Sequence, residues 1–168
     1  MENPPEVQPF FLQKYDYDCG VAVVASVLLR FQKAFDYDGL FEKLGTSEVV
    51  GTTSTRIVEF MNESGLKAKR VENSSLEVIK EMIGQGKTCI VMYQNWDNDE
   101  LDDALEYGHY AIVKKIKDGK VVLQDPAINE DRGFGVGVYE HDILEFERVW
   151  IDKENGEVIK RAFICVSE

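Results

Sequence analysis

The sequence has no run of about 18 apolar residues, so we expect no helix that crosses a membrane. Its first residues, Met1-Glu2-Asn3-Pro4-Pro5, lack the basic region and the apolar core of a secretion signal. Basic residues are few, because 19 lysines and arginines stand against 31 aspartates and glutamates, which gives a net charge of −12. This charge repels nucleic-acid phosphates and anionic membranes, so nucleic acid is a poor candidate partner, whereas a basic or neutral substrate is easier to accommodate.

Cysteine is scarce as well. The three cysteines, Cys19, Cys89 and Cys165, are an odd number, and no secretion signal precedes them. We therefore expect reduced thiols and a cytoplasmic location. The cysteines and the two histidines show no C-x-x-C or H-x-x-H-like spacing, so we expect no metal site, and nothing in the sequence points to a cofactor.

What the sequence does contain is typical of one globular domain over residues 1–168, with 44% hydrophobic and 30% charged residues. Apolar periodicity and capping residues predict helices in the first half, and alternating apolar residues predict strands in the second. Helices first and antiparallel strands second give an α+β fold. We expect helices at about 19–32, 37–44, 54–64, 76–83 and 139–146, and strands at 67–71, 88–93, 109–116, 120–124 and 158–166. We expect the last strand to pair with 148–151 through Glu154-Asn155-Gly156.

A cysteine stands where a loop becomes the first helix. The segment Gln13–Gly20 is polar, and the apolar run that follows Cys19 indicates a mostly buried helix. A thiol in the first turn of a helix faces unpaired backbone N–H groups and the positive end of the helix dipole, and both favour the reactive thiolate. The side-chain amide of Gln13, six residues upstream, could fold back and donate a hydrogen bond to a developing oxyanion.

A hairpin is predicted to bring His109 and Asp125 together. Lys117-Asp118-Gly119 joins the two strands, and Asp-Gly at such a position is a strong hairpin signal. His109 begins the first strand and Asp125 follows the second, so the two side chains are placed to touch. We interpret Cys19 as a nucleophile, His109 as its general base and then general acid, Asp125 as the residue that orients the imidazole, and Gln13 as the oxyanion donor.

These motifs together resemble a known family. Gln13 with Asp18-Cys19-Gly20, then Gly108-His109-Tyr110, then Gln124-Asp125-Pro126, is similar to the double-glycine (bacteriocin-leader) type of cysteine peptidase. The resemblance implies a papain-like fold, a cysteine nucleophile and a histidine–aspartate pair at Cys19, His109 and Asp125, and Gln13 in the oxyanion hole. Members that cleave bacteriocin leaders usually form part of a membrane transporter, whereas the resemblance here covers most of the chain, so we expect a freestanding peptidase domain.

Other interpretations stay open at this point. Cys19 could be a buried structural thiol, and the same constellation could serve an acyltransferase, a transglutaminase-like enzyme or a peptide-binding module without catalysis. His141 is expected in a polar helix start, exposed to solvent. One segment is strongly acidic and is either a solvated loop or a lip over the substrate cleft that prefers basic substrates or holds calcium; its residues are Asp97, Asp99, Glu100 and Asp102.

Overall fold

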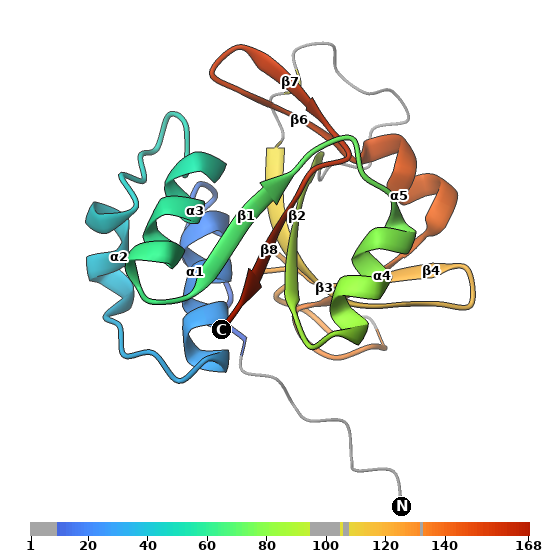
Figure 1. The fold of residues 1–168 in the computed structure, drawn as a ribbon, viewed down its shortest axis with the longest axis horizontal. Coiled ribbons are helices and arrows are strands. Elements are labelled where there is room, and N and C mark those ends of the chain that lie inside the picture. The colour runs from blue at the N-terminus through green and yellow to red at the C-terminus, as the bar shows by residue number, and fades with distance from the viewer. Residues whose placement is uncertain (1–9, 95–104, 106–107, 132) are drawn as a thin grey trace, which may run out of the picture.

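The structure is a computed structural model that describes residues 10–94, 105, 108–131 and 133–168. Helices come first along the chain and strands dominate the second half (Figure 1), so the predicted α+β class is confirmed. The helices are α1 (Cys19–Arg30), α2 (Tyr37–Lys43), α3 (Ser54–Glu63), α4 (Leu76–Gly84) and α5 (Ile143–Val149). The strands are β1 (Lys67–Val71), β2 (Thr88–Gln94), β3 (Gly108–Lys117), β4 (Lys120–Gln124), β5 (Val138–Asp142), β6 (Ile151–Glu154), β7 (Glu157–Lys160) and β8 (Phe163–Ser167).

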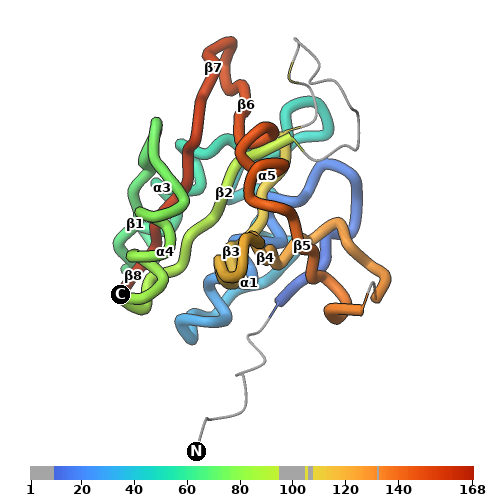
Figure 2. The backbone as a smooth tube through the Cα atoms, turned by 90° about the vertical axis from the view of Figure 1, so that its right-hand side faces the viewer, coloured from blue at the N-terminus to red at the C-terminus, as the bar shows by residue number. Residues whose placement is uncertain are grey.

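Six strands form one antiparallel sheet in the order β1-β8-β2-β3-β4-β5. Strands β6 and β7 pair only with each other and form a hairpin that extends beyond the end of this sheet in both views (Figures 1 and 2). This separate hairpin lies near the amino end of β3, where the site described below is found.

The sheet has an apolar core on each face because its central strands alternate their side chains. In β2, Ile90 and Met92 pack with α1, α2 and α3, whereas Val91 and Tyr93 pack on the other face with α4 and α5. Figure 1 shows the two groups of helices on opposite sides of the sheet. Helix α1 is buried along almost its whole length, so its first residue is fixed in position by the core.

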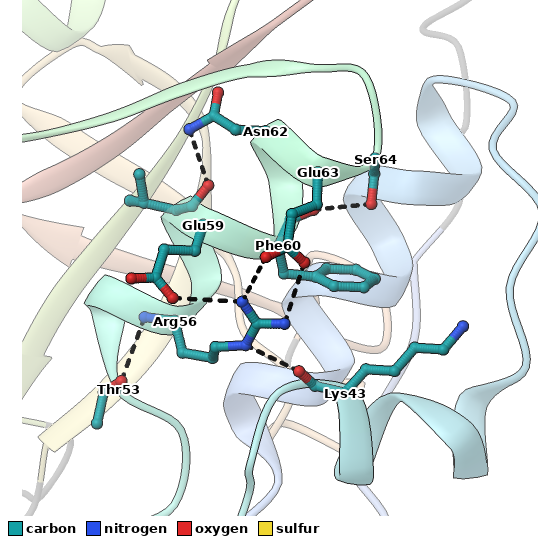
Figure 3. Close-up of polar contacts among 9 residues, drawn as sticks. Lys43, Thr53, Arg56, Glu59, Phe60, Asn62, Glu63 and Ser64 are labelled. Carbon is teal, nitrogen blue, oxygen red and sulfur yellow. Dashed lines mark hydrogen bonds and ion pairs between the residues drawn. The ribbon is translucent and has the colours of Figure 1, made fainter.

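Helix α3 is fastened at both ends by polar contacts (Figure 3). The side chain of Thr53 accepts a hydrogen bond from the backbone N–H of Arg56, which caps the amino end. The guanidinium of Arg56 donates to Glu59 and Glu63 on the same helix and to the backbone carbonyl of Lys43 at the end of α2. These contacts tie α3 to α2 on the surface that faces away from the sheet.

Two sequence expectations differ from the structure. Residues 139–146 were expected to form a helix, but Val138–Asp142 is strand β5, because these residues pair with β4, and helix α5 begins only at Ile143. The expected last strand at 158–166 is divided into β7 and β8, with Arg161 between them at a φ of 48°. Within the described residues no helix is long and apolar enough to span a membrane.

Candidate active site

Cys19 is the first residue of α1 and is half-buried. The next residue, Gly20, lets the first turn of α1 pack closely against the loop that contains Thr52. A Cβ atom on Gly20 would lie 2.7 Å from both Cβ and Oγ1 of Thr52. The hydroxyl of Thr52 in turn forms a 2.7 Å hydrogen bond with that of Thr46. The thiol is therefore held at the entrance of a rigid helix, with the loop of residues 46–52 against its first turn.

The loop before Cys19 is organised by a carboxylate that is completely buried. Asp18 accepts hydrogen bonds from the backbone N–H groups of Lys14 at 3.0 Å and Tyr15 at 2.8 Å, and from the hydroxyl of Tyr37 at 2.9 Å. Although Asp18 immediately precedes α1, its side chain does not cap the helix. Its oxygens instead shape the turn between Gln13 and Cys19, a role that the sequence analysis did not assign.

The predicted hairpin is confirmed, and it brings His109 and Asp125 into contact. Strands β3 and β4 pair across Asp118 and Gly119, whose φ values of 53° and 74° suit a type I′ turn. The Nε2 atom of His109 lies 2.6 Å from Oδ1 of Asp125, and both side chains are buried. The second ring nitrogen, Nδ1, is then the one available to another partner.

Asp125 is held by further donors that the sequence analysis did not identify. The backbone N–H of Ala127 donates to Oδ1 at 2.9 Å, and the hydroxyl of Tyr93 donates to Oδ2. Burial alone would raise the pKa of Asp125, but the charge of His109 and these hydrogen bonds hold it below its usual value. Tyr93 could have been found only from the pairing of β2 with β3, in which it stands directly opposite His109.

Cys19 contributes to the electrostatic environment of His109. Burial alone would lower the pKa of His109, but the charges of Asp125 and Cys19, together with hydrogen bonds to both side chains, raise it to about 10. The imidazole is consequently protonated at neutral pH. The structure thus places His109 in contact with Asp125, and Cys19 affects the pKa of the imidazole, while the catalytic roles of the three residues stay a prediction.

Gln13 is anchored to the same region through its backbone. Its N–H donates to the carbonyl of Pro126 at 2.9 Å, directly after Asp125. Its side-chain Nε2 donates to the carbonyl of Tyr15 at 2.6 Å, and its Oε1 is buried with no hydrogen-bond partner among the described residues. One N–H of the amide is thereby engaged and a second remains for a ligand, so the oxyanion role of Gln13 stays a prediction.

A cleft of about 750 Å³ opens beside Cys19. Its walls come from the loop around residues 48–53, from the beginning of β3 and from the β6–β7 hairpin. Leu105 also lines it, whereas the predicted lip residues Asp97, Asp99, Glu100 and Asp102 lie outside the described residues. The residues that line the cleft include Cys19, Thr52, Gly108, Tyr110, Asp152 and Glu154.

The remaining cysteines and the second histidine lie away from this cleft. Cys89 and Cys165 stand opposite each other on β2 and β8 in the core, and a hydrogen bond to Cys165, together with burial, raises the pKa of Cys89 well above its usual value. His141 was expected in an exposed helix start; it lies instead on β5, with its ring 4.4 Å from that of Tyr139 and 5.9 Å from that of Phe146. The expectation was wrong because β5 extends the sheet here.

Comparison with known proteins identifies the group to which the sequence belongs. Residues 8–152 match the Peptidase C39 family. The chain belongs to this family. It is therefore a cysteine peptidase, a hydrolase, as the resemblance of its motifs predicts. The matched region ends at Asp152, so most of the β6–β7 hairpin lies beyond it.

Individual C39 relatives are distant in sequence but close in fold. The chain is 24% identical over 113 residues to the SPbeta prophage-derived sublancin-168-processing and transport ATP-binding protein SunT of Bacillus subtilis, a match that spans 66% of this chain and 14% of SunT. It is similar to a double glycine motif protease from an AMS/PCAT transporter, solved in complex with the leader peptide, with 20% identity, a TM-score of 0.64 and coverage of 94% and 88% of the two chains.

A second solved structure gives the same result. The peptidase domain of Streptococcus ComA, a bifunctional ABC transporter, has a TM-score of 0.68 with 20% identity, and the match covers 95% of this chain and 98% of that domain. These likenesses establish the papain-like α+β fold that the sequence predicts.

Proposed function

We propose that this chain hydrolyses a peptide bond with Cys19 as nucleophile, His109 as general base and then general acid, and Asp125 as the residue that orients the imidazole. The observation that carries the proposal is the 2.6 Å contact between His109 and Asp125, together with the contribution of Cys19 to the raised pKa of His109. Together they link a half-buried thiol to a protonated imidazole that is held by a buried carboxylate. This is the arrangement that thiol peptidases require.

The reaction follows from the positions of these groups. His109 takes the thiol proton of Cys19 as general base, and the sulfur attacks the scissile carbonyl carbon. His109 then transfers this proton to the departing amine as general acid while the carbon–nitrogen bond breaks. A thioester remains on Cys19. Water then attacks the thioester while His109 accepts a proton from it, and the acid product leaves as the sulfur recovers its electron pair.

Gln13 is proposed to stabilise the oxyanion that forms in both steps. Its backbone bond to Pro126 holds it beside Asp125, and its side-chain amide keeps one N–H that is not used by Tyr15. The first turn of α1 supplies main-chain N–H groups that have no acceptor within the helix. Preorganised donors of this kind reduce the barrier by about 3 kcal/mol in acyl transfer.

Leader peptides that end in a double glycine are the proposed substrates. Support comes from membership of the C39 family and from relatives that are described by leader-peptide binding and sublancin processing. Because the chain spans only 14% of SunT, we do not extend the transport activity of SunT to this chain.

A labelling experiment with the whole chain tests the role of Cys19. A peptidyl electrophile that ends in Gly-Gly should attach to one cysteine of the protein, as located by mass spectrometry of its fragments, and Cys19→Ala should remove the adduct. Cys165→Ala is the matched control and should label like the parent, since Cys165 is buried in the core. An adduct on Cys89 or Cys165 that persists in Cys19→Ala would refute the assignment.

A product measurement separates hydrolysis from acyl transfer. With a double-glycine peptide in H₂¹⁸O, hydrolysis incorporates one ¹⁸O atom into the released acid. Addition of a primary amine should leave this product dominant. An amide with the added amine as the main product would instead make the chain an acyltransferase that uses the same residues.

A further inference from the structure

We propose that Asp152 determines substrate specificity by receiving a positively charged group of the peptide in the cleft beside Cys19. The proposal rests on the proposed peptidase function and adds a residue outside the four already discussed. Asp152 is the second residue of β6, and it lines the same cleft as Cys19. Its carboxylate is half-buried, so it is shielded from bulk water yet accessible from the cleft.

Asp152 lies against the backbone next to the proposed base. A Cβ atom on Gly108 would come within 2.3 Å of Oδ1 and 3.0 Å of Cγ of Asp152, so this carboxylate occupies the space that a side chain at position 108 would fill. Gly108 immediately precedes His109 in β3. The hairpin and the glycine together therefore place a carboxylate one residue from the catalytic imidazole.

The hydrogen bonds of Asp152 leave half of its carboxylate unused. Oδ1 accepts from the backbone N–H of Lys153 at 2.8 Å and from the side-chain amide of Gln94 at 3.3 Å. Among the residues that the structure describes, no donor reaches Oδ2 and no lysine or arginine forms an ion pair with Asp152. The hydration that Oδ2 loses on burial is therefore not replaced by any donor among the described residues.

Glu154, two residues along the same strand, differs from Asp152 because both of its carboxylate oxygens accept hydrogen bonds. It accepts hydrogen bonds from the backbone N–H and the hydroxyl of Ser54 and from the guanidinium of Arg70, the last at 3.0 Å. These contacts fasten the hairpin to the start of α3. Glu154 is thus fully used for structure, whereas Asp152 faces the cleft with a free oxygen.

A cationic group of the substrate would complete the environment of Asp152. Burial raises the pKa of Asp152 to about 6, with the charge of Glu154 adding to the effect and with the hydrogen bonds from Lys153 and Gln94 and the charge of His109 opposing it. Above that pH the carboxylate is charged and attracts a cation. The cation is an ammonium or guanidinium group, supplied either by a lysine or arginine side chain or by the free amino terminus of a short peptide.

Peptide kinetics with the whole chain test this inference. The substrates are internally quenched peptides with Gly-Gly directly before the cut. Lysine, norleucine or glutamate stands at one of the three positions before the Gly-Gly or the three positions after the cut. Each peptide is made with an acetylated and with a free amino terminus. At one position lysine should raise kcat/KM at pH 7.5 about tenfold over norleucine, which has the same shape without the charge, and glutamate should lower it. If the free amino terminus is the ligand, the tenfold gain follows deacetylation instead.

Asp152→Asn should reduce this gain to less than twofold while norleucine peptides are still cleaved. Glu157→Gln removes one charge from the exposed side of the same hairpin and is the matched control, which should retain the full gain. In the parent the gain should also fall as the pH is lowered through about 6, because Asp152 then becomes protonated. A parent that gains neither from lysine nor from a free amino terminus, or an Asp152→Asn variant that keeps the gain, overturns the inference and leaves the peptidase function standing.

A second measurement decides the inference even if none of these peptides is cleaved, an outcome that would contradict only the proposed substrate. Charged methanethiosulfonate reagents modify Cys19 without peptide recognition. The ratio of rates for a cationic and an anionic reagent should fall at least threefold in Asp152→Asn and remain unchanged in Glu157→Gln. Equal ratios in parent and Asp152→Asn would show that this carboxylate does not govern charge preference in the cleft.

Discussion

The hydroxyl of Tyr93 donates a hydrogen bond to Oδ2 of Asp125, the oxygen that His109 does not use. Both residues are buried, and Tyr93 stands opposite His109 in the pairing of β2 with β3. The carboxylate is thereby fixed from two sides, so its orientation toward the imidazole depends on a residue outside the proposed catalytic set.

Tyr93→Phe should weaken catalysis through this contact. Without the hydroxyl, Oδ2 of Asp125 is left buried without this donor, which costs about 1–2 kcal/mol of folding free energy. We expect kcat/KM to fall about tenfold, equivalent to about 1.4 kcal/mol, from a less firmly held imidazole. Tyr15→Phe is the control, because Tyr15 is exposed and should change neither quantity. An active Tyr93→Phe enzyme with the parent's urea midpoint would contradict the role of this contact.

The pKa of about 10 for His109 predicts an activity that persists into alkaline solution. The imidazole must carry a proton to give to the departing amine, so kcat/KM should fall only as the pH approaches about 10. Asp125→Asn removes the charge that contributes most to the raised pKa, so the alkaline limb should move to lower pH. Asp142→Asn, at an exposed carboxylate paired with Lys120, should leave the profile unchanged.

The raised pKa of His109 also makes the stability of the fold depend on pH. The pKa of His109 rises from its ordinary 6.5 to about 10 on folding. The contact between His109 and Asp125 therefore stabilises the fold fully below a pH of about 6.5, and this contribution is lost as the pH rises toward about 10. Urea unfolding of the parent and of His109→Gln should accordingly differ most at pH 6 and converge toward pH 10. A difference that grows with pH would be opposite in sign to this expectation.

The parts of the site that depend on local rules could be predicted from the sequence. Asp118-Gly119 fixes a two-residue turn that pairs the strands carrying His109 and Asp125. Their contact also depends on a register shift between Val113 and Lys115, which places the two side chains on the same face and which no local rule predicts. The helix that starts at Cys19 follows equally from its apolar run. Docking of Cys19 against His109 was a tertiary inference, which the family motifs supported and with which the contribution of Cys19 to the raised pKa of His109 agrees.

Other parts could not be predicted because they depend on contacts between distant segments. The sequence predicts Tyr93 only as the last residue of a buried strand. Its pairing with β3 in the structure shows that it reaches Asp125. Asp152 belongs to a hairpin whose pairing was expected, but the expected strands at 148–151 and 158–166 differ from β6 and β7, and nothing in the sequence shows that this hairpin leaves the main sheet. Long-range packing, rather than propensity, decides such positions.

Asp18→Ala should destabilise the loop that carries Gln13. The substitution leaves two backbone N–H groups and the hydroxyl of Tyr37 without their acceptor in a buried position, which costs about 3 kcal/mol. The loop should then hold Gln13 less firmly, so kcat should fall more than KM rises. Asp36→Ala provides the comparison: it removes the exposed cap of α2, costs about 1 kcal/mol and leaves kcat unchanged. Equal kinetic effects of the two substitutions would argue against a positioning role for Asp18.

The hairpin turn offers the sharpest test of how the site is assembled. Gly119 has a φ of 74°, and a Cβ atom there would meet nothing within 4 Å, so any cost of Gly119→Ala comes from backbone conformation alone. We expect about 1–2 kcal/mol of destabilisation and a lower kcat/KM, because the turn starts the pairing of the two strands that carry His109 and Asp125. Gly84 at the end of α4 is equally uncrowded but has no positive φ, so Gly84→Ala should stabilise the fold by up to about 1 kcal/mol and leave activity unchanged. If both substitutions shift the urea midpoint in the same direction, the turn does not control the pairing on which the proposed catalytic contact depends.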